Sequence, residues 1–350
     1  VAARTGSEEV SIAEAAGCIL AQSIVAPAAV PASAVALREG FAVTAGETVG
    51  ATPYAPVYAF EMPQTLAIGD ALPESTDAIL PFSAVATERQ PVEILATVSP
   101  GESVRRAGGD FAANAIIRGE GEKLRQSDVA HLQQAGITHV SVAVARAMIF
   151  VAKGEVEHAI ANWLETIIPS AGASAKIVAF ETDEELTALL ARPATDLVAI
   201  VAETQLSARV LRSSGKLLAH GVAIDPGESM GCGCIEQDGR KVPVILMPHR
   251  PEAAFAAWLL LLRPCLDVCL GATDPRAEAI FPLSRKIVSA PGRADLVLLR
   301  RKAKGLNTMW EPLATGDLPW QALAQAEAWH LIGAGSEGMP QGEPLRAEYF

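Results

Sequence analysis

The chain has 350 residues, of which 50% are hydrophobic and 19% charged, and its formal net charge is -12. This composition excludes a disordered chain, and the length predicts two or three domains with a substantial core. Aromatic residues make up only 5%, so alanine and valine supply most of the apolar content, as in closely packed α/β layers. The acidic balance argues against a nucleic-acid surface, which would be basic, but backbone N–H groups at a helix start can still bind a small anion.

Neither a signal peptide nor a membrane span is expected. The first residues run into an acidic pair without an apolar stretch. The most apolar windows, Ala253–Leu262 and Met148–Ala152, fall short of the roughly 18 residues that a membrane span needs. Five cysteines, an odd number, favour free thiols in a reducing cytoplasm. Neither Cys232-Gly-Cys234 nor the pair Cys265 and Cys269 has further ligands at zinc-site spacing.

The first 143 residues predict short elements separated by turns. Residues 8–24 favour a helix, with Ser11 as its N-cap and apolar residues at helical spacing. Residues 45–103 favour short strands between turns that contain proline and glycine. A helix capped by Ser127 is expected to end at Gly136, and a strand is expected over 138–144.

From Met148 onwards, strands alternate with helices of about ten residues, which is typical of βαβ units and a parallel sheet. The expected strands are Met148–Ala152, Lys176–Phe180, Asp196–Val201 and Val242–Met247. The expected helices are Val156–Ile168, Asp183–Leu190 and Pro251–Leu270. Residues 275–350 are punctuated by glycine and proline and predict a small terminal domain of short strands.

Taken by themselves, the residues that could carry chemistry provide few signals. The sequence has no P-loop and no Gly-x-Gly-x-x-Gly pattern, and Gly231-Cys-Gly233 and Gly333-Ala-Gly335 are interpreted as loop glycines. The six histidines lack metal-ligand spacing and are expected to be surface or packing residues. No nucleophile-elbow pattern supports a Ser–His–Asp triad. These residues alone indicate a cytoplasmic α/β protein and no particular reaction.

The order of several short motifs adds more information. In chain order they are Val30-Pro31, Glu39-Gly-Phe-Ala-Val43, Leu72-Pro-Glu-Ser-Thr-Asp77-Ala-Ile-Leu-Pro81, Val104-Arg-Arg-Ala-Gly-Gly-Asp110, His220-Gly-Val-Ala-Ile-Asp-Pro226-Gly227, Met247-Pro-His-Arg-Pro251, Arg263-Pro264, Pro291-Gly-Arg-Ala-Asp295 and Gly342-Glu343. The series resembles the molybdopterin molybdotransferases, the family of MoeA and the gephyrin E domain, over nearly the whole chain. Each motif alone is weak, but their common order is hard to obtain by chance.

The resemblance implies an elongated, multidomain α/β homodimer. The implied domains are a linker domain at 26–44 plus 104–143, a small β-rich insert at 45–103, a molybdopterin-binding α/β sheet domain at 8–25 plus 144–271, and a β-barrel-like C-terminal domain at 275–350. Family members bind adenylylated molybdopterin in a cleft that includes parts of the partner subunit, insert molybdate with Mg2+, and release the molybdenum cofactor. Such a ligand needs cations or backbone N–H groups, and Mg2+ needs one or two carboxylates plus waters.

The motifs nearest the implied site differ from those of the family. Ser-Ala-Met-Asp-Gly-Tyr-Ala becomes Ala36-Leu-Arg-Glu39-Gly-Phe-Ala42, and Thr-Gly-Asp-Glu becomes Lys153-Gly154-Glu155-Val156. The phosphate-binding Gly-Gly-Val-Ser turn falls on Ala202-Glu-Thr-Gln205, which has no glycine. Pro-Gly-Lys-Pro becomes Pro226-Gly227-Glu228-Ser229, which reverses a charge, and Leu-Pro-Gly-Asn-Pro becomes Met247-Pro248-His249-Arg250-Pro251.

By resemblance, the expected catalytic residues are Glu155, Glu39 and Asp110, with Glu155 also as the Mg2+ ligand. The expected cofactor-binding residues are Lys153, Gly154, Arg105, Pro226, Gly227, Pro248 and Arg250. Three functions stay open. The first is molybdopterin binding with molybdate insertion. The second is a catalytically inactive, dimeric binding or scaffold protein, which the lost glycine turn favours. The third is a βαβ enzyme of unrelated chemistry.

Overall fold

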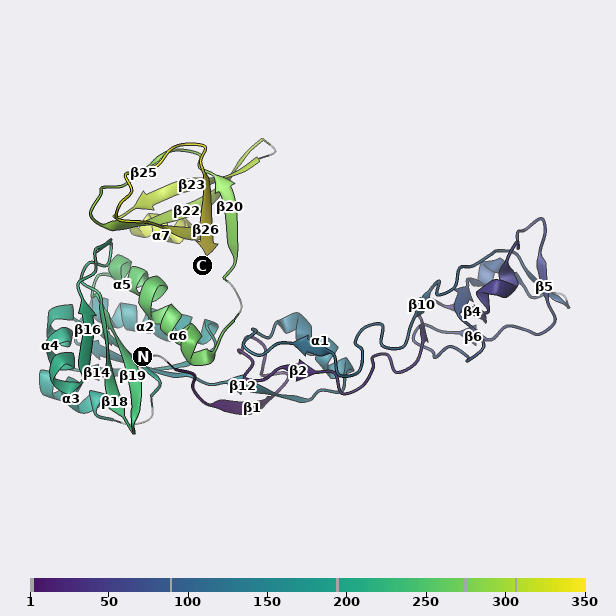
Figure 1. Cartoon of the computed structure of the whole chain (residues 1–350), viewed down its shortest axis with the longest axis horizontal. Helices are drawn as coiled ribbons and strands as arrows, with labels where there is room; N and C mark the ends of the chain where they lie inside the picture. Colours follow the sequence, from purple (N-terminus) through teal and green to yellow (C-terminus); the bar gives the residue numbers. More distant parts are fainter. Residues whose placement is uncertain (1–2, 89, 193–194, 274–275, 306) are drawn as a thin grey trace. The chain divides into compact units, whose positions relative to one another are not determined.

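A computed structural model describes residues 3–88, 90–192, 195–273, 276–305 and 307–350 of the chain. The chain divides into two compact units (Figure 1). Unit 1 contains residues 1–22, 120–126 and 139–350, and unit 2 contains residues 23–119 and 127–138. Both units combine helices and strands, which confirms the expected mixed α/β, multidomain class.

A six-stranded sheet forms the centre of unit 1, with the strand order β14-β13-β15-β19-β18-β16. Its strands are β13 (Arg146–Ala152), β14 (Ser174–Phe180), β15 (Leu197–Val201), β16 (Lys216–His220), β18 (Gly231–Gln237) and β19 (Arg240–Met247). The strands β14, β13, β15 and β19 are parallel, whereas β18 is antiparallel to both of its neighbours. The carboxyl ends of β13, β14, β15 and β19 therefore lie at one edge of the sheet.

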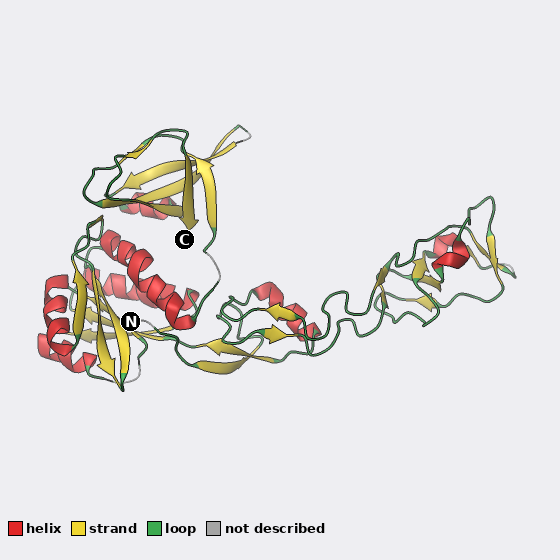
Figure 2. Ribbon diagram, viewed as in Figure 1, coloured by secondary structure: helices red, strands yellow, loops and turns green. Residues whose placement is uncertain are grey.

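Helices cover both faces of this sheet (Figures 1 and 2). They are α2 (Glu155–Ser170), α3 (Asp183–Leu190), α4 (Thr204–Ser214), α5 (Pro251–Ala257), a π-helical turn at Trp258–Leu262, and α6 (Arg263–Leu270). Buried side chains of α2 and α6, such as Leu164 and Leu266, share one core cluster. Leu186 of α3 and Leu211 of α4 belong to a second cluster on the other face. The apolar stripes of these helices thus form a three-layer α/β/α arrangement.

Most predictions for residues 148–270 are confirmed, with ends that differ by a few residues, and α3 has its predicted bounds. The prediction that Gly231 and Gly233 are loop glycines is wrong, because both lie in β18. A Cβ atom on Gly233 would lie 2.3 Å from the carbonyl oxygen of Lys216, so glycine here lets β16 approach. The strands β16 and β18 and the helix α4 were not predicted. Gly333 and Gly335 do lie outside strands and helices, as expected.

The helix predicted at residues 8–24 is also wrong. The segment forms β1 (Ser7–Ser11), which pairs antiparallel with β12 (His139–Ala143), and then continues through turns. Ile19 and Leu20 are buried, as their pattern indicated, but they lie in isolated bridges to Lys123 and Val142. Pairing with a distant strand has here overridden the local helical pattern.

The run Pro251–Leu270 differs from expectation in another respect. With a mean hydropathy of 1.8, it is long and apolar enough to cross a membrane, although no such window was expected. Its residues Ala254, Leu262 and Leu266 are fully buried in the core beside the sheet. Core helices often satisfy the same length and composition criteria, and the packing of this run accounts for its apolar character.

The last part of unit 1 is rich in strands, as predicted. Its elements are β17 (Ile224–Asp225), β20 (Glu278–Pro282), β21 (Ile287–Val288), β22 (Ala294–Lys304), β23 (Asn307–Thr315), α7 (Trp320–Gln325), β24 (Ala328–Ile332), β25 (Gly338–Met339) and β26 (Pro344–Tyr349). Five of them form a sheet of order β17-β22-β24-β26-β20, and β23 pairs with β22. The strands β22 and β23 are longer than the short strands that were expected.

Unit 2 is built from short strands and turns. Its elements are β2 (Ile24–Val25), β3 (Val35–Ala36), β4 (Gly40–Val43), β5 (Val57–Ala59), β6 (Thr65–Leu66), β7 (Ala78–Leu80), β8 (Val85–Ala86), β9 (Val92–Ile94), β10 (Val104–Arg105), β11 (Ile116–Arg118), the 3-10 helices Ala45–Thr48 and Phe82–Ala84, and α1 (Gln126–Gln134), whose first residue belongs to unit 1. Two three-stranded sheets, β6-β4-β7 and β5-β9-β8, form most of its framework. The expected short strands and a helix in this part of the chain are confirmed, but α1 begins at Gln126, so Ser127 is not its N-cap.

Candidate functional site

The carboxyl edge of the six-stranded sheet gathers most of the predicted site residues of unit 1. The chain leaves β13 towards β14 on one side, whereas β15 lies on the other side of β13, so the strand order reverses there. Open α/β sheets bind ligands at such a point. Lys153 and Gly154 follow β13, and Glu155 begins α2. Pro248 and Arg250 lie between β19 and α5. The first turns of these helices expose N–H groups to this edge.

The loop after β13 carries one cation and several carboxylates. The Lys153 Nζ atom lies 3.4 Å from the Glu181 Oε1 atom, and both side chains are exposed. Glu155 and Glu157 occupy the first turn of α2. Carboxylates at this position interact favourably with the helix dipole and would attract a metal cation rather than an anion. The Gly154 carbonyl is 2.8 Å from the His158 Nδ1 atom, which ties the loop to the helix.

The loop between β17 and β18 carries a second cluster of charges. The Gly227 N–H donates to Glu228 Oε2 at 3.1 Å, and Arg250 Nη2 lies 3.8 Å from Glu228 Oε1. Arg250 Nε also lies 3.1 Å from Glu252 Oε1. Burial raises the pKa of Glu228, but the N–H groups of Glu228 and Gly227 and the charges of Arg250 and Arg293 outweigh it, so the net pKa is lowered. Glu228 is therefore an anion at neutral pH.

An apolar hollow of about 460 Å³ adjoins these first turns. It is lined by Ala159 and Trp163 of α2, Pro251 and Phe255 of α5, Trp320 of α7 and three further apolar side chains. The Trp163 and Phe255 rings lie 5.9 Å apart, and the side chain of Trp320 is 71% exposed. Flat aromatic ligands stack on such rings. These residues lie far apart in the sequence. The only sequence signal for the hollow is that Trp163 and Trp320 are large aromatic residues in a chain that has few.

Comparison with known proteins shows a family match for the N-terminal part of the chain and relatives of similar fold over its whole length. A sequence family described as the MoeA N-terminal region (domain I and II) matches residues 1–136. A Methanocaldococcus jannaschii protein named for molybdopterin biosynthesis is 24% identical over 96% of this chain and 90% of its own length. Molybdopterin molybdenumtransferase 2 of Mycobacterium tuberculosis is 24% identical over 90% of this chain and 88% of its own. A solved structure of a molybdopterin biosynthesis MoeA protein from Pyrococcus horikoshii covers 100% of this chain and 96% of its own with a TM-score of 0.80 and 22% identity.

Residues 1–136 thus match the MoeA N-terminal family, and the chain as a whole has the fold of MoeA proteins. The family match and the MoeA fold confirm the resemblance that the ordered motifs indicated. A second Pyrococcus horikoshii structure of this kind has a TM-score of 0.74 and 24% identity over 99% of this chain and 95% of its own.

Unit 2 contains the remaining candidate site residues. Arg105, at the end of β10, forms an ion pair with Asp110. Glu39 is exposed in the turn between β3 and β4. Packing requires glycine at the neighbouring position 40, because a Cβ atom on Gly40 would lie 2.1 Å from the Leu80 carbonyl oxygen. The Gly40 position of the family motif therefore has a structural reason in this chain, whereas the roles of Glu39, Arg105 and Asp110 stay predictions.

The charge reversal at residue 228 proves to be matched by another change. The sequence marks Glu228 as a lost lysine and Arg250 as a new cation, and the structure brings these two residues together. The cation expected for ligand binding thus faces Glu228 and Glu252. The sequence signal for this pairing was a charge change in each of two motifs. One motif gained Glu228 in place of lysine, and the other gained Arg250.

Metal ligation was expected at Glu155. Among the residues that the structure describes, no group of three or more His, Cys, Asp or Glu side chains could hold a metal ion. Mg2+ that arrives with phosphates needs only one or two protein carboxylates. Glu155 and Glu157 in the first turn of α2 are oxygen donors that suit this requirement.

The five cysteines are free thiols, as expected from their number. Burial raises the pKa of Cys265, and it raises the pKa of Cys269 to about 12. Thiols with such raised pKa values are poor nucleophiles and poor metal ligands at neutral pH. The cysteines are therefore packing residues rather than part of the candidate site.

Proposed function

We propose that this MoeA-like protein acts in molybdenum cofactor biosynthesis and binds adenylylated molybdopterin at the carboxyl edge of the six-stranded sheet. The observation that carries the proposal is the aromatic hollow beside two helix starts and two cations, Lys153 and Arg250. The names of the M. tuberculosis and M. jannaschii relatives, a molybdopterin molybdenumtransferase and a molybdopterin biosynthesis protein, support the same substrate class. The predicted cytoplasmic location and homodimer are part of this proposal.

Each group in this region has a task under the proposal. The rings of Trp163, Phe255 and Trp320 stack against the flat pterin, which excludes water from one of its faces. Lys153 and Arg250 bind phosphate oxygens, and the N–H groups at the starts of α2 and α5 add to their field. Glu155 holds Mg2+, which neutralises phosphate and molybdate charge when it is bound. Gly154, Pro226, Gly227 and Pro248 shape the loops that carry these groups.

Molybdate insertion requires more than binding. Glu155 would supply the acid on the metal side, and the roles of Glu39, Asp110 and Arg105, which the resemblance implies, stay predictions. Molybdate is the substrate of this step, and its negative charge has to be met by cations in the site. We propose that this chain inserts molybdate only if ligand binding separates Arg250 from Glu228, so that the arginine can meet the negative charge.

A second candidate is a non-catalytic binding protein of the same fold. Glu203 precedes α4, and Thr204 is its first residue, where the family has a glycine turn. Thr204 is buried, so its side chain occupies space beside the first turn of α4. Added side chains at this position hinder close approach of a phosphate to the backbone. This observation favours a binding or scaffold protein that takes a partner protein or a different small ligand.

Site-directed variants test the binding site. We expect Lys153→Met and Arg250→Met each to weaken binding of adenylylated molybdopterin about tenfold, since each removes a charge-assisted contact. Matched controls are Lys216→Met and Arg240→Met, because these residues begin β16 and β19 at the opposite edge of the sheet. Quenching of tryptophan fluorescence measures the affinity. Equal effects of the two pairs of variants would place the ligand elsewhere.

Insertion is tested separately from binding. The enzyme hypothesis predicts that the full chain, with ligand, Mg2+ and molybdate, produces molybdenum cofactor, and that Glu155→Gln abolishes this production while binding without Mg2+ is unchanged. The binding-protein hypothesis predicts unchanged ligand and no product. Reconstitution of a cofactor-free molybdoenzyme measures the product in both cases.

A further inference from the structure

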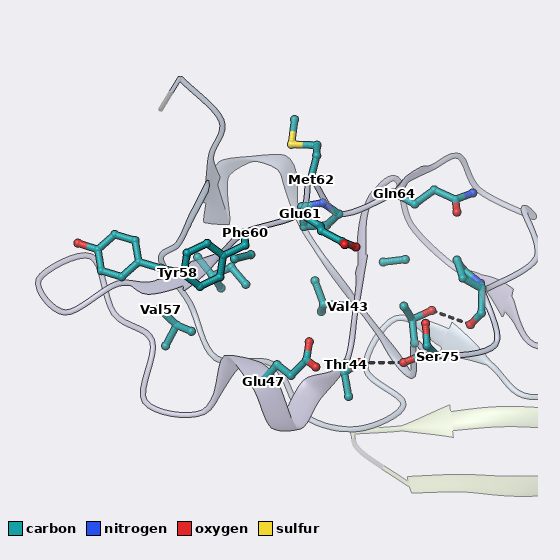
Figure 3. Close-up of a pocket in the computed structure, with 16 residues that line it drawn as sticks. Val43, Thr44, Glu47, Val57, Tyr58, Phe60, Glu61, Met62, Gln64 and Ser75 are labelled. Carbon is teal, nitrogen blue, oxygen red and sulfur yellow. Dashed lines mark hydrogen bonds between the residues drawn. The ribbon is translucent and has the colours of Figure 1, made fainter. Parts of the chain in front are cut away.

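Unit 2 contains a large groove that none of the predicted site residues lines. Its volume is about 680 Å³, within the range of roughly 300–1,000 Å³ that is usual for binding pockets. Residues of β4, β5 and the segments 60–64 and 73–76 line it (Figure 3). The lining includes Val43 and Ile94, which belong to a core cluster of unit 2, and Val57, which packs against that cluster. The groove therefore rests on a packed framework.

The charge of the groove is entirely acidic. Glu47 and Glu61 line it, and their side chains lie on either side of Val43 in Figure 3. No Lys, Arg or His is among the described residues that line it. The surrounding sequence from 41 to 100 has acidic residues at 47, 61, 70, 74, 77, 88 and 93 and a single basic residue at 89. This region attracts a cationic partner and repels phosphates.

Several large apolar side chains that line the same groove are exposed to solvent. Phe60 is 82% exposed, Tyr58 55% and Met62 54%, and all three line the groove. In Figure 3, the labelled side chains of Tyr58 and Phe60 are at one end of the groove. Exposed groups of aromatic residues and methionine are typical of protein interaction sites. Aromatic rings beside carboxylates also suit lysine and arginine, through cation–π contacts.

The backbone along the groove has an open edge. Within the described part of the chain, β5 pairs only with β9, so its other edge presents unpaired N–H and C=O groups. An extended peptide can add to such an edge as a further strand, with main-chain hydrogen bonds that supply affinity and side-chain contacts that supply specificity.

From the acidic lining, the exposed rings and the open edge of β5, we propose that this groove binds an extended, basic segment of a partner protein. The segment lies along β5, its lysine or arginine side chains meet Glu47 and Glu61, and its apolar side chains cover Tyr58 and Phe60. The proposal does not depend on the proposed function of unit 1, because no residue of that site takes part.

Selection from a displayed library of random dodecapeptides on the immobilised full chain tests the proposal. The expected result is enrichment of peptides in which lysine or arginine alternates with aliphatic or aromatic residues. For a synthetic peptide of the enriched sequence, Glu47→Gln with Glu61→Gln is expected to weaken binding about tenfold, and Phe60→Ala about fivefold. Because Glu47, Glu61 and Phe60 are at the surface, thermal unfolding should be unchanged.

The matched control is the double variant Glu88→Gln with Glu93→Gln. It removes the same charge from the same region, but neither residue lines the groove. Equal weakening by both double variants would show an unspecific charge effect and overturn the proposal, as would enrichment of acidic or uncharged peptides or none. Enriched sequences that match segments of this chain would identify a second copy as the occupant and would also contradict a separate partner.

Discussion

Glu228 and Arg250 determine how much positive charge the sheet edge of unit 1 can offer to a ligand. Each stands where the family motif has a residue of different charge, and the two lie within ion-pair distance of each other. At about 4 Å and an effective dielectric constant of 20, such a pair interacts by about 4 kcal/mol before screening, and exposure reduces this to about 1 kcal/mol or less. Ligand phosphates can therefore compete with Glu228 for Arg250.

Replacement of Glu228 tests this balance. Glu228→Lys restores the family's charge and frees Arg250, so we expect adenylylated molybdopterin to bind about tenfold more tightly. Glu228→Gln removes the anion alone and should have an intermediate effect. Calorimetric titration measures both affinities. Weaker binding by the lysine variant would show that Glu228 itself contacts the ligand or holds the loop.

A partly buried ion pair supports unit 2 at the residue scale. Arg118 Nε and Nη2 each lie 2.9 Å from a different oxygen of Asp128, and Asp128 is buried. Asp128→Ala leaves the guanidinium without this partner, so we expect a loss of about 3 kcal/mol in the free energy of unfolding. Asp183→Ala in the exposed pair with Arg209, at 3.5 Å, should cost less than about 1 kcal/mol. Urea unfolding compares them, and similar losses would contradict the argument.

Among the elements, the parallel strands of unit 1 were the most predictable. Their continuous apolar runs, such as Met148–Ala152, are typical of strands covered on both faces. The segment at residues 8–24 was not predictable in this way, because its apolar spacing fits a helix, while the partner of β1 lies at residues 139–143. Strand β18 was missed because its glycines have no side-chain pattern.

The candidate site was predictable only in part for a related reason. Residues at the ends of strands, such as Lys153 and Arg250, follow from the order of elements along the chain. The hollow beside them combines Trp163, Phe255 and Trp320, which come from three helices distant in sequence. No local pattern relates these residues, so tertiary packing alone brings them together.

The short helix α7 offers a test of the hollow. Trp320 is exposed, so Trp320→Ala should leave the thermal midpoint unchanged and weaken binding of adenylylated molybdopterin about tenfold through lost stacking. Trp320→Phe keeps an aromatic ring and should restore most of the affinity. If alanine and phenylalanine behave alike, the ring does not contact the ligand.

His330 in strand β24 should make the stability of the folded protein depend on pH. Burial lowers the pKa of His330, although a backbone hydrogen bond with Arg346 opposes this. The folded state therefore prefers the neutral imidazole. Its stabilising effect is full above the unfolded pKa of about 6.5 and is lost as the pH falls through the lower folded value. The thermal midpoint should decrease as the pH is lowered from 7 to 5, and the decrease should be smaller in the His330→Gln variant. An equal decrease in both proteins would contradict this assignment.

For the whole molecule, the acidic net charge of -12 contrasts with the cations that an anionic ligand requires. In unit 1, Lys153 and Arg250 lie near helix starts at one sheet edge, but each faces a carboxylate, so a ligand anion has to compete with Glu181, Glu228 and Glu252 for them. Unit 2 retains the acidic character, with Glu47 and Glu61 in its groove. Under the two proposals, the units take ligands of opposite charge, a cofactor precursor in unit 1 and a basic peptide in unit 2.

The central claim is that the sheet edge of unit 1 binds the cofactor precursor. Calorimetric titration of the full chain with adenylylated molybdopterin, with and without Mg2+, tests it most directly. The account predicts a dissociation constant of about 1 μM, corresponding to about -8 kcal/mol, and tighter binding with Mg2+ through Glu155. The absence of binding heat at high protein concentration, with and without Mg2+, would contradict it.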